Sequence, residues 1–265
     1  MYTIHLFCKI IKYRFFAQIE YPGAFLAGIL AQWLVYGIEM LMMFLVVWNF
    51  GSLKGWEPTE IVFLFAIWVM TYALAATFAF NICQNFSRLS IEGTMDEALT
   101  RPVSPFAYLL ATHVNVGYVS HISLATVAII YSILQLQIHW TISQWLWFFV
   151  LLFCGAIITG CLMLLCYMPA MLTRSESPLR ILFWQSRTFG SYPLTIYPGG
   201  LQLFFTIFFP VAFIGFYPVQ ALLGKQEGLF TPIAIWLSPV VAVILIALTI
   251  CVWKKISIHY ESAGT

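Results

Sequence analysis

Six long apolar runs alternate with shorter polar segments along the chain. They lie near Ala24–Trp48, Thr59–Ile82, Phe106–Leu134, Ser143–Met168, Gly200–Leu223 and Pro232–Trp253. A helix of about 20 apolar residues is long enough to cross the hydrocarbon core of a bilayer. Strands of a membrane barrel would instead alternate apolar and polar residues in segments of about ten. The pattern therefore predicts an all-α integral membrane protein, with six transmembrane helices over residues 24–253.

A short amphipathic stretch precedes the first run. Its apolar residues recur at helical spacing: Ile4, Phe7, Ile11 and Phe15. The basic residues Lys9 and Lys12 lie off that face. This predicts an interfacial helix over residues 1–20, with its basic side toward anionic headgroups; the alternative is a frayed tail with flanking charges. The first run, at about 25 residues, suits a span rather than the short apolar core of a signal peptide.

The composition excludes a soluble domain. Hydrophobic residues make up 62% of the chain and charged residues 8%, and the mean hydropathy is +0.92. The 24 Phe and 10 Trp residues are more than a soluble domain of 265 residues could bury. We expect a single membrane domain over residues 1–265. No basic stripe lies outside the membrane flanks, so no nucleic-acid partner is expected.

The distribution of Lys and Arg predicts the orientation. With the N-terminus inside, only Lys54 and Lys225 of the 12 basic residues fall on the outer side. The other ten are Lys9, Lys12, Arg14, Arg88, Arg101, Arg174, Arg180, Arg187, Lys254 and Lys255. Cytoplasmic loops of membrane proteins carry an excess of Lys and Arg. Both termini, including a tail over residues 254–265, are therefore predicted to be cytoplasmic.

The polar segments on the two sides differ in length. The predicted outer loops, near 49–58, 135–142 and 224–231, are short and provide no domain that could capture a soluble substrate. The inner segments, 1–20, 83–105 and 169–199, are longer, which suggests a partner on the cytoplasmic face. Within the last of them, Pro178–Phe189 could form a second amphipathic helix on the membrane surface.

Catalytic and metal-binding motifs are missing from the sequence. There is no Walker A segment, no Cys-x-x-Cys pair and no His, Asp or Glu cluster with metal-ligand spacing. The six Cys residues lie mostly in or beside the spans, where they are best interpreted as small buried residues. We therefore expect a non-catalytic chain that holds no cofactor.

Polar residues inside two spans are the candidates for a translocation path. In the first span, Gly28, Gln32, Tyr36 and Glu39 share one arc of the helix. A carboxylate at the bilayer centre costs about 2.5–3.5 kcal/mol on insertion scales, so Glu39 needs a partner or a watery cavity. The third span carries a similar stripe, formed by His113, Gly117 and Ser120 with His121 at its edge. These side chains could line a path, or they could hold helices together by hydrogen bonds.

The most polar passage of the chain is the inner segment EGTMDEALTRPVSP, residues 92–105. Thr94 and Glu97 have the spacing of a capping box, and Asp96 and Glu97 favour the positive end of a helix dipole. Pro102 ends this short helix, and Ser104–Pro105 begins the next span. A helix of about two turns is marginal alone. It either docks on another protein or serves as a connector resting on the membrane.

This plan resembles the permease subunit of type-2 ABC exporters. The residues that carry the resemblance are the Gly93-x-x-Asp96-x-x-Leu99-x-Arg101-Pro run, the Tyr192-Pro-Leu-Thr-Ile-Tyr-Pro-Gly run, Phe209-Pro210 and Tyr217-Pro218. More narrowly, the chain is similar to bacterial ABC-2-like permeases that are encoded as pairs beside one ATPase. The inner loop 169–199 is longer than the connection common in other type-2 exporters.

The resemblance implies that residues 93–101 form a coupling helix that inserts into a groove of a cytoplasmic ABC ATPase dimer. Met95 and Leu99 would be its apolar contacts, with Asp96, Glu97 and Arg101 as polar ones and Gly93 and Thr94 at its start. The ATPase would bind ATP and Mg²⁺. A second permease chain and membrane lipid would be the other partners, in a bacterial plasma (inner) membrane. The resemblance implies export, and the lack of an outer domain favours an amphipathic or lipid-like molecule, a drug or a peptide as the substrate.

Two other function classes compete with this interpretation. A proton-coupled secondary transporter could use Glu39 and the histidines, but it would predict inverted internal repeats, and the sequence has none. An intramembrane enzyme would need a nucleophile–base or metal set, which the sequence lacks. A neighbouring ATPase gene would distinguish the exporter from both.

Overall fold

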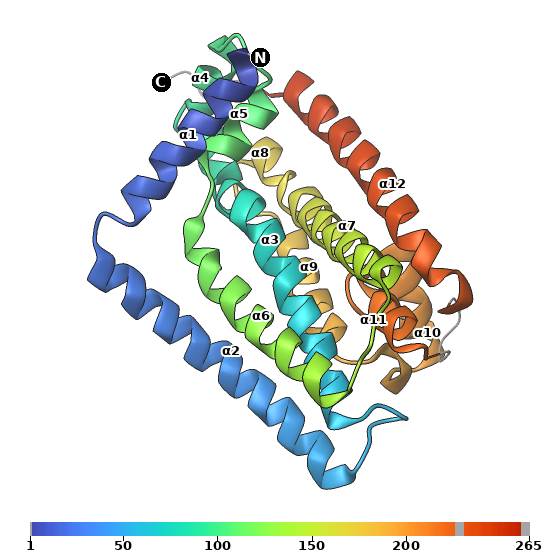
Figure 1. Cartoon of the computed structure of the whole chain (residues 1–265). Coiled ribbons are helices and arrows are strands. Elements are labelled where there is room, and N and C mark those ends of the chain that lie inside the picture. The colour runs from blue at the N-terminus through green and yellow to red at the C-terminus, as the bar shows by residue number, and fades with distance from the viewer. Residues whose placement is uncertain (1, 226–230, 261–265) are drawn as a thin grey trace.

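The structure is a computed structural model that describes residues 2–225 and 231–260. These residues form a bundle of helices without a named strand (Figure 1). The α-helices are α1 (Tyr2–Gln18), α2 (Pro22–Phe50), α3 (Pro58–Ile91), α4 (Thr94–Thr100), α5 (Pro105–Thr112), α6 (Val119–Gln135), α7 (Ile142–Tyr167), α8 (Ala170–Thr173), α9 (Leu179–Gly190), α10 (Gly199–Leu203), α11 (Phe216–Leu223) and α12 (Thr231–Ile258). Short 3-10 turns lie at Val116–Tyr118, Leu194–Ile196 and Val211–Phe213, and a π-helical turn at Phe204–Phe208.

The helices confirm the prediction of an all-α membrane protein. Among the described residues, five helices are long and apolar enough to cross a bilayer: α2, α3, α6, α7 and α12. A bent pair, Gly199–Phe208 with Val211–Leu223, makes up to six if it counts as one span. Residues 226–230 of the third outer loop and 261–265 of the tail lie outside the described residues.

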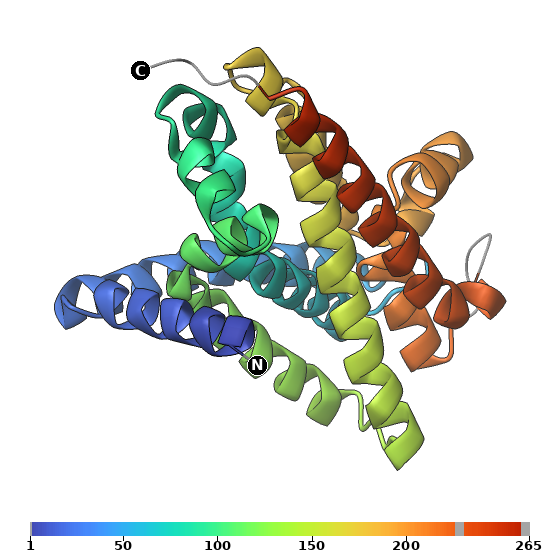
Figure 2. The ribbon, with the colours of Figure 1, turned by 90° about the horizontal axis from the view of Figure 1, so that it is seen from above.

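Helix α3 is the centre of the bundle. It packs against α7, α6 and α2, and every residue from Ile61 to Ala73 is buried. Small side chains such as Ala73 and Ala76 let the neighbouring helices approach closely, which is how membrane helices gain packing energy. Viewed from above, α1 and α2 lie on one side of α3, and α10 to α12 lie on the other (Figure 2).

Helix α2 is packed far more loosely than α3. In the apolar stretch that qualifies each helix as a membrane span, 6% of the residues are buried in α2 and 83% in α3. It meets α6 through Trp33, whose indole N–H donates to Ser123 Oγ at 3.1 Å, and through Tyr36, whose ring meets His121 edge-on at 4.6 Å. Large side chains such as Leu34 point away from the bundle. In a bilayer, this surface faces lipid or another chain.

The predicted third span, Phe106–Leu134, is wrong as a single helix. Helix α5 ends at Thr112 and α6 begins only at Val119. Asn115 lies in the break, where its backbone N–H donates to Thr77 O of α3 at 2.8 Å and its side chain accepts from the Gly117 N–H at 2.9 Å. An Asn side chain that bonds to nearby backbone offers an alternative to helix, and this interrupts the span.

Helix α1 is tied to this break. The Gln18 amide donates to Val114 O at 2.8 Å and accepts from the Val116 N–H at 2.6 Å. Helix α1 runs at a steep angle to α2, and an elbow at residues 19–21 joins them (Figure 1). The helix expected over residues 1–20 is therefore present, and its position at the membrane interface stays a prediction.

The predicted fifth span, Gly200–Leu223, is also wrong as a continuous helix. Its two halves are bent by 77° at Phe209–Pro210. Proline lacks the N–H that would continue a helix, and it pushes the residue before it toward extended geometry, as found at Phe209 (φ −131°, ψ 82°). The bend brings Ile214 against α7 at Gly155, where an added Cβ would lie 2.7 Å from Ile214 O.

The predicted amphipathic helix at Pro178–Phe189 forms as α9, but it does not lie apart on a surface. Helix α9 packs against α7, and it buries Phe183, Ser186 and Gly190. Its Arg187 reaches the middle of α3, where the guanidinium carbon lies 3.8 Å from the ring centroids of Trp68 and Tyr72. The assignment of Arg187 to the cytoplasmic side is therefore wrong, because small and aromatic residues on one face of α9 draw it into the bundle.

A clasp closes the end of the molecule opposite α4; it is named the outer clasp because the charge bias predicts that this end faces outward. It consists of Gly55, Trp56, Glu60 and Lys225. The Lys225 ammonium donates to Gly55 O at 2.6 Å, lies 2.8 Å from Glu60 Oε2 and sits 5.1 Å from the Trp56 ring centroid. Trp56 is fully buried. The clasp joins the α2–α3 loop to the end of α11.

Candidate functional site

Helix α4 is the first of two candidate sites. It begins after Gly93, which adopts the left-handed conformation (φ 70°) that glycine tolerates without strain. The Asp96 and Glu97 N–H groups donate to Gly93 O at 3.0 and 3.3 Å. The expected Thr94–Glu97 capping box is wrong, because Gly93 occupies the N-cap and the Glu97 side chain turns the other way. The helix ends at Thr100, before Pro102, as predicted.

The apolar side of α4 faces its own chain. Met95 and Ala98 are both fully buried, and Met95 belongs to the main core. Helix α4 packs against α3 and α5. Leu99, in contrast, is 46% exposed. The expectation that Met95 meets an ATPase therefore does not fit this structure. One face of this short helix packs against the rest of the chain, and Met95 lies on that face.

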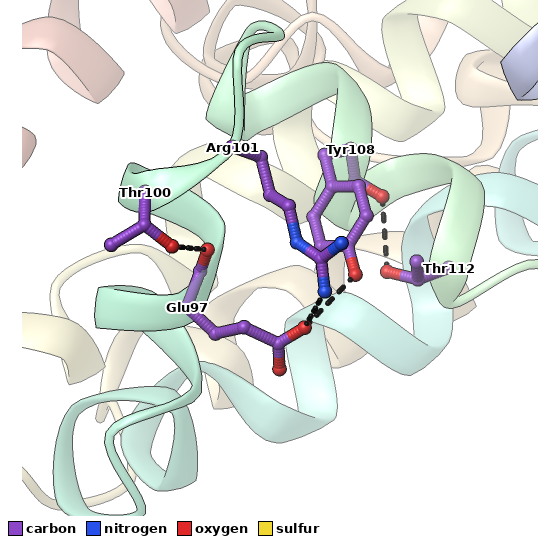
Figure 3. Close-up of polar contacts among 5 residues, drawn as sticks. All are labelled: Glu97, Thr100, Arg101, Tyr108 and Thr112. Carbon is purple, nitrogen blue, oxygen red and sulfur yellow. Dashed lines mark hydrogen bonds and ion pairs between the residues drawn. The ribbon is translucent and has the colours of Figure 1, made fainter.

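Polar side chains fix α4 against α5. Glu97 Oε1 accepts from Arg101 Nη2 at 2.6 Å and from the Tyr108 hydroxyl at 3.3 Å, and the three side chains converge (Figure 3). Arg101 also lies over the Tyr108 ring, at 5.5 Å. The hydrogen bond from Arg101 and its positive charge lower the pKa of Glu97, and the Tyr108 bond adds to this. Of the other predicted coupling residues, Gly93, Thr94 and Asp96 are half-buried at the start of the helix.

The second candidate site is a cavity of about 520 Å³ between α2, α3, the α5–α6 break and α9. Two of the predicted path residues on α2, Gln32 and Tyr36, line it together with His121 of α6. Gly28 and Gly117, from the same two stripes, line it as well. The structure thus brings together side chains from two spans that were singled out separately.

The remaining predicted path residues are not in the cavity lining. Glu39 lies one turn further along α2 and is exposed, while Ser120 is buried and donates to Gly117 O at 2.8 Å. His113 is the first residue after α5, at the start of the break, and its Nδ1 is 2.9 Å from Leu109 O. The prediction that His113, Gly117 and Ser120 share one helical face is wrong, because the break separates His113 from the other two.

A comparison with protein families identifies the family of this chain. A model described as "ABC-2 family transporter protein" matches residues 33–264. The chain belongs to the ABC-2 transporter family. Being a family member, it is a multi-pass membrane protein and the permease subunit of an ABC transporter, a kind of subunit that works with an ATPase partner. No curated protein and no solved structure matches the chain.

Aromatic residues of this ABC-2 chain complete the cavity, and the sequence alone did not single them out. Tyr72 and Tyr118 line it, and their hydroxyls lie 3.4 Å apart. Trp184 of α9 also lines it and donates to the Tyr167 hydroxyl at 2.8 Å. Their only sequence signal was the polar atom on a ring within an apolar run. Asn115 carried a stronger signal, since an amide inside a predicted span needs partners.

Neither site has the donors that a metal centre requires. No group of three or more His, Cys, Asp or Glu residues comes together in residues 2–225 and 231–260. The six Cys residues are all free thiols, with Cys83, Cys161 and Cys166 buried. The arrangement can bind and guide a molecule through aromatic, amide and imidazole groups.

Proposed function

We propose that this ABC-2 permease is the membrane-spanning part of an ATP-driven exporter in a bacterial inner membrane. Two such chains, identical or similar, would form the translocation path, and a cytoplasmic ATPase dimer would drive it through α4. The chain itself would carry out no chemistry. The single observation that supports this proposal best is the two-sided character of α4, with Met95 and Ala98 buried in the body and Leu99 exposed.

A helix held in this way is suited to transmitting motion. Met95 and Ala98 anchor α4 to the core, and Glu97 and Arg101 join it to Tyr108 on α5. A push on the exposed side of α4 therefore reaches α3, the central helix, and α5 at the same time. Because α5 leads into the break beside the cavity, movement at α4 has a short route to the cavity wall.

The test uses Leu99→Glu and purification of the permease with its ATPase. Burial of a leucine side chain in a groove contributes roughly 1.5–3 kcal/mol, and an unpaired carboxylate in its place costs more. We expect Leu99→Glu to retain normal expression and thermal stability, because this side chain is 46% exposed. It should lose the ATPase during purification and lose transport-coupled ATP hydrolysis.

Ile142→Glu is the matched control. Ile142 is 82% exposed and starts α7, at the opposite end of the molecule from α4. The same change there should leave ATPase binding intact. Wild-type ATPase stoichiometry in Leu99→Glu would refute docking through this helix and leave α4 as a connector.

A further inference from the structure

Arg187 of α9 is a half-buried cation that makes no ion pair within the described residues. Its guanidinium is sandwiched between the rings of Trp68 and Tyr72, at 3.8 Å from each centroid. Its Nε and Nη2 atoms are buried and have no hydrogen-bond partner in the part of the chain that the structure describes. An arginine side chain stays charged in proteins. Stacking on two aromatic faces stabilises the cation, but it leaves the three N–H donors of Nε and Nη2 without an acceptor.

The charge of Arg187 reaches the cavity. Tyr72, which touches the guanidinium, also lines the cavity, as does Trp184, whose ring centroid is 5.6 Å from the guanidinium carbon. Arg187 interacts electrostatically with Tyr72, Tyr118 and His121, three of the lining residues. No Asp or Glu is among the residues that line the cavity. Glu39, an acidic group on which the charge of Arg187 acts, lies outside the lining. Arg187 itself borders a separate small pocket with Trp68 and Tyr72, so its positive charge acts on the cavity through the lining rings of Tyr72 and Trp184.

The cavity is also open beside α2. Its α2 residues Gly28 and Gln32 are exposed, and α2 is the least buried of the long helices. Phe25 and Phe80 give it apolar walls. The first turns of α2 are at the end of this helix that the charge bias assigns to the cytoplasm. A molecule could thus enter from the inner half of the bilayer with its apolar chain remaining in lipid.

We propose that this cavity binds the oxyanion head of an amphipathic substrate, with Arg187 as the charge that selects it and the aromatic residues covering the adjoining apolar part. This inference rests on the proposed transport function and names its substrate class. A carboxylate, sulfate or phosphate head would satisfy the same chemistry. A cationic amphiphile would be repelled by Arg187 and would find no carboxylate in the lining to pair with.

The test measures binding in the absence of any ATPase. The purified full chain is placed in phosphatidylcholine nanodiscs that contain a small fraction of brominated phosphatidylglycerol or, in parallel, brominated phosphatidylcholine. Bromine quenches nearby tryptophan, and the difference between the wild type and Trp184→Phe isolates the cavity signal. We expect the anionic lipid to quench Trp184 several-fold more strongly than the neutral lipid at the same fraction.

Two charge variants test the role of Arg187. Arg187→Gln should remove the preference for the anionic lipid, and Arg187→Lys should retain part of it. Because Arg187→Gln could fail to fold, Gln32→Glu provides a second variant that places a carboxylate in the lining with almost no change in shape. It should abolish the preference, whereas Asn49→Asp, at the far end of α2, should keep it.

Each outcome decides the proposal. Equal quenching by the two lipids in the wild type, or an unchanged preference in both Arg187→Gln and Gln32→Glu, would overturn it. Competition by inorganic phosphate would show that the site takes a free oxyanion and would overturn the amphipathic part. Since this binding needs no ATPase, a failure here is separate from a failure of the Leu99→Glu test.

Discussion

Gly155 lies at a close contact between α7 and two of its neighbours. A Cβ at this position would lie 2.7 Å from Ile214 O and 2.8 Å from Thr71 Cγ2, closer than such atoms can approach. One of these atoms is backbone in the bent segment and the other is a buried side chain of α3, so neither can move cheaply. Glycine here lets three parts of the bundle meet.

Gly155→Ala should therefore destabilise the protein by about 1–3 kcal/mol, the usual cost of overpacking. Gly160→Ala is the matched control on the same helix, because its added Cβ would lie at an ordinary 3.7 Å from Ala75 Cβ. Thermal unfolding in detergent, followed by tryptophan fluorescence, measures both. A Gly155→Ala variant that melts at or above the temperature of Gly160→Ala would show that the contact at Gly155 tolerates a Cβ.

Glu97 provides a pH-dependent test of the α4 contacts. Its pKa is lowered from the ordinary value of 4.5 by the hydrogen bond and charge of Arg101. A group whose folded pKa is lowered contributes stability above its unfolded pKa, and this is lost as the pH falls through the folded value. Protection of the α4 amides from hydrogen exchange, corrected for intrinsic rates, should fall below pH 4.5 in the wild type. It should be lower and pH-independent over that range in Glu97→Gln.

Individual site residues could be predicted only where polarity stood out against an apolar run. Gln32, Tyr36 and His121 were found in this way, and they line one cavity. Met95 was assigned to a partner because periodicity shows which residues share a face, not which neighbour covers that face. Met95 is covered by α3 and α5, and the sequence of a seven-residue helix does not show which other helices pack on it.

Among the elements, α1 and the α5–α6 break form a unit. Gln18 holds both sides of the break with two hydrogen bonds, to Val114 O and from the Val116 N–H. The interrupted helix leaves backbone groups without helical partners, and the Gln18 amide bonds to them. An unpaired backbone group inside a membrane would cost free energy. Helix α1 is thus fastened to the element that leads from α4 to the cavity.

Gln18→Ala should release α1 and lower stability by about 1–3 kcal/mol, since buried backbone groups lose their partners. Limited proteolysis within residues 1–20 of the purified protein measures the release, and the melting temperature measures the stability. Tyr13→Ala, a change at a side chain that is 72% exposed on the same helix, should alter neither. Equal proteolysis rates in the two variants would contradict this role of Gln18.

The positions of helices were easier to predict from the sequence than their continuity. Long apolar runs are local features, so the ranges of α2, α3, α7 and α12 follow the predicted spans. Both broken spans depend on single residues, Asn115 and Pro210, whose effects differ with context. Proline does not always break a helix, as Pro239 inside α12 shows. The bend at Pro210 also needs Gly155 to make room for it.

At the scale of the whole molecule, the distribution of Lys and Arg predicts the orientation in the membrane. Ten basic residues were assigned to the inner side, but Arg187 lies against Trp68 and Tyr72 and no longer counts. Nine against two still favours cytoplasmic termini. A tertiary contact can thus remove one residue from the count of Lys and Arg on each side without reversing the predicted orientation.

Cysteine labelling measures this orientation. In a variant without the six native cysteines, Thr100→Cys on α4 should resist a membrane-impermeant reagent in intact cells and react after permeabilisation. Lys54→Cys, on the predicted outer loop, should react in intact cells, and it serves as the control. Both positions are exposed in the structure. Labelling of Thr100→Cys in intact cells would reverse the topology and remove the basis for ATPase docking at α4.

The outer clasp has a mechanical consequence. Trp56 is fully buried beneath Lys225 and against Phe216, whose ring centroid is 5.8 Å away. If the outer ends of α3 and α11 separate, this indole is exposed to water, at a cost of roughly 1.5–3 kcal/mol for a large apolar side chain. That cost acts as a restoring force. An outward opening would therefore close by itself once a substrate has left. Closing would need no further energy from the cytoplasmic side.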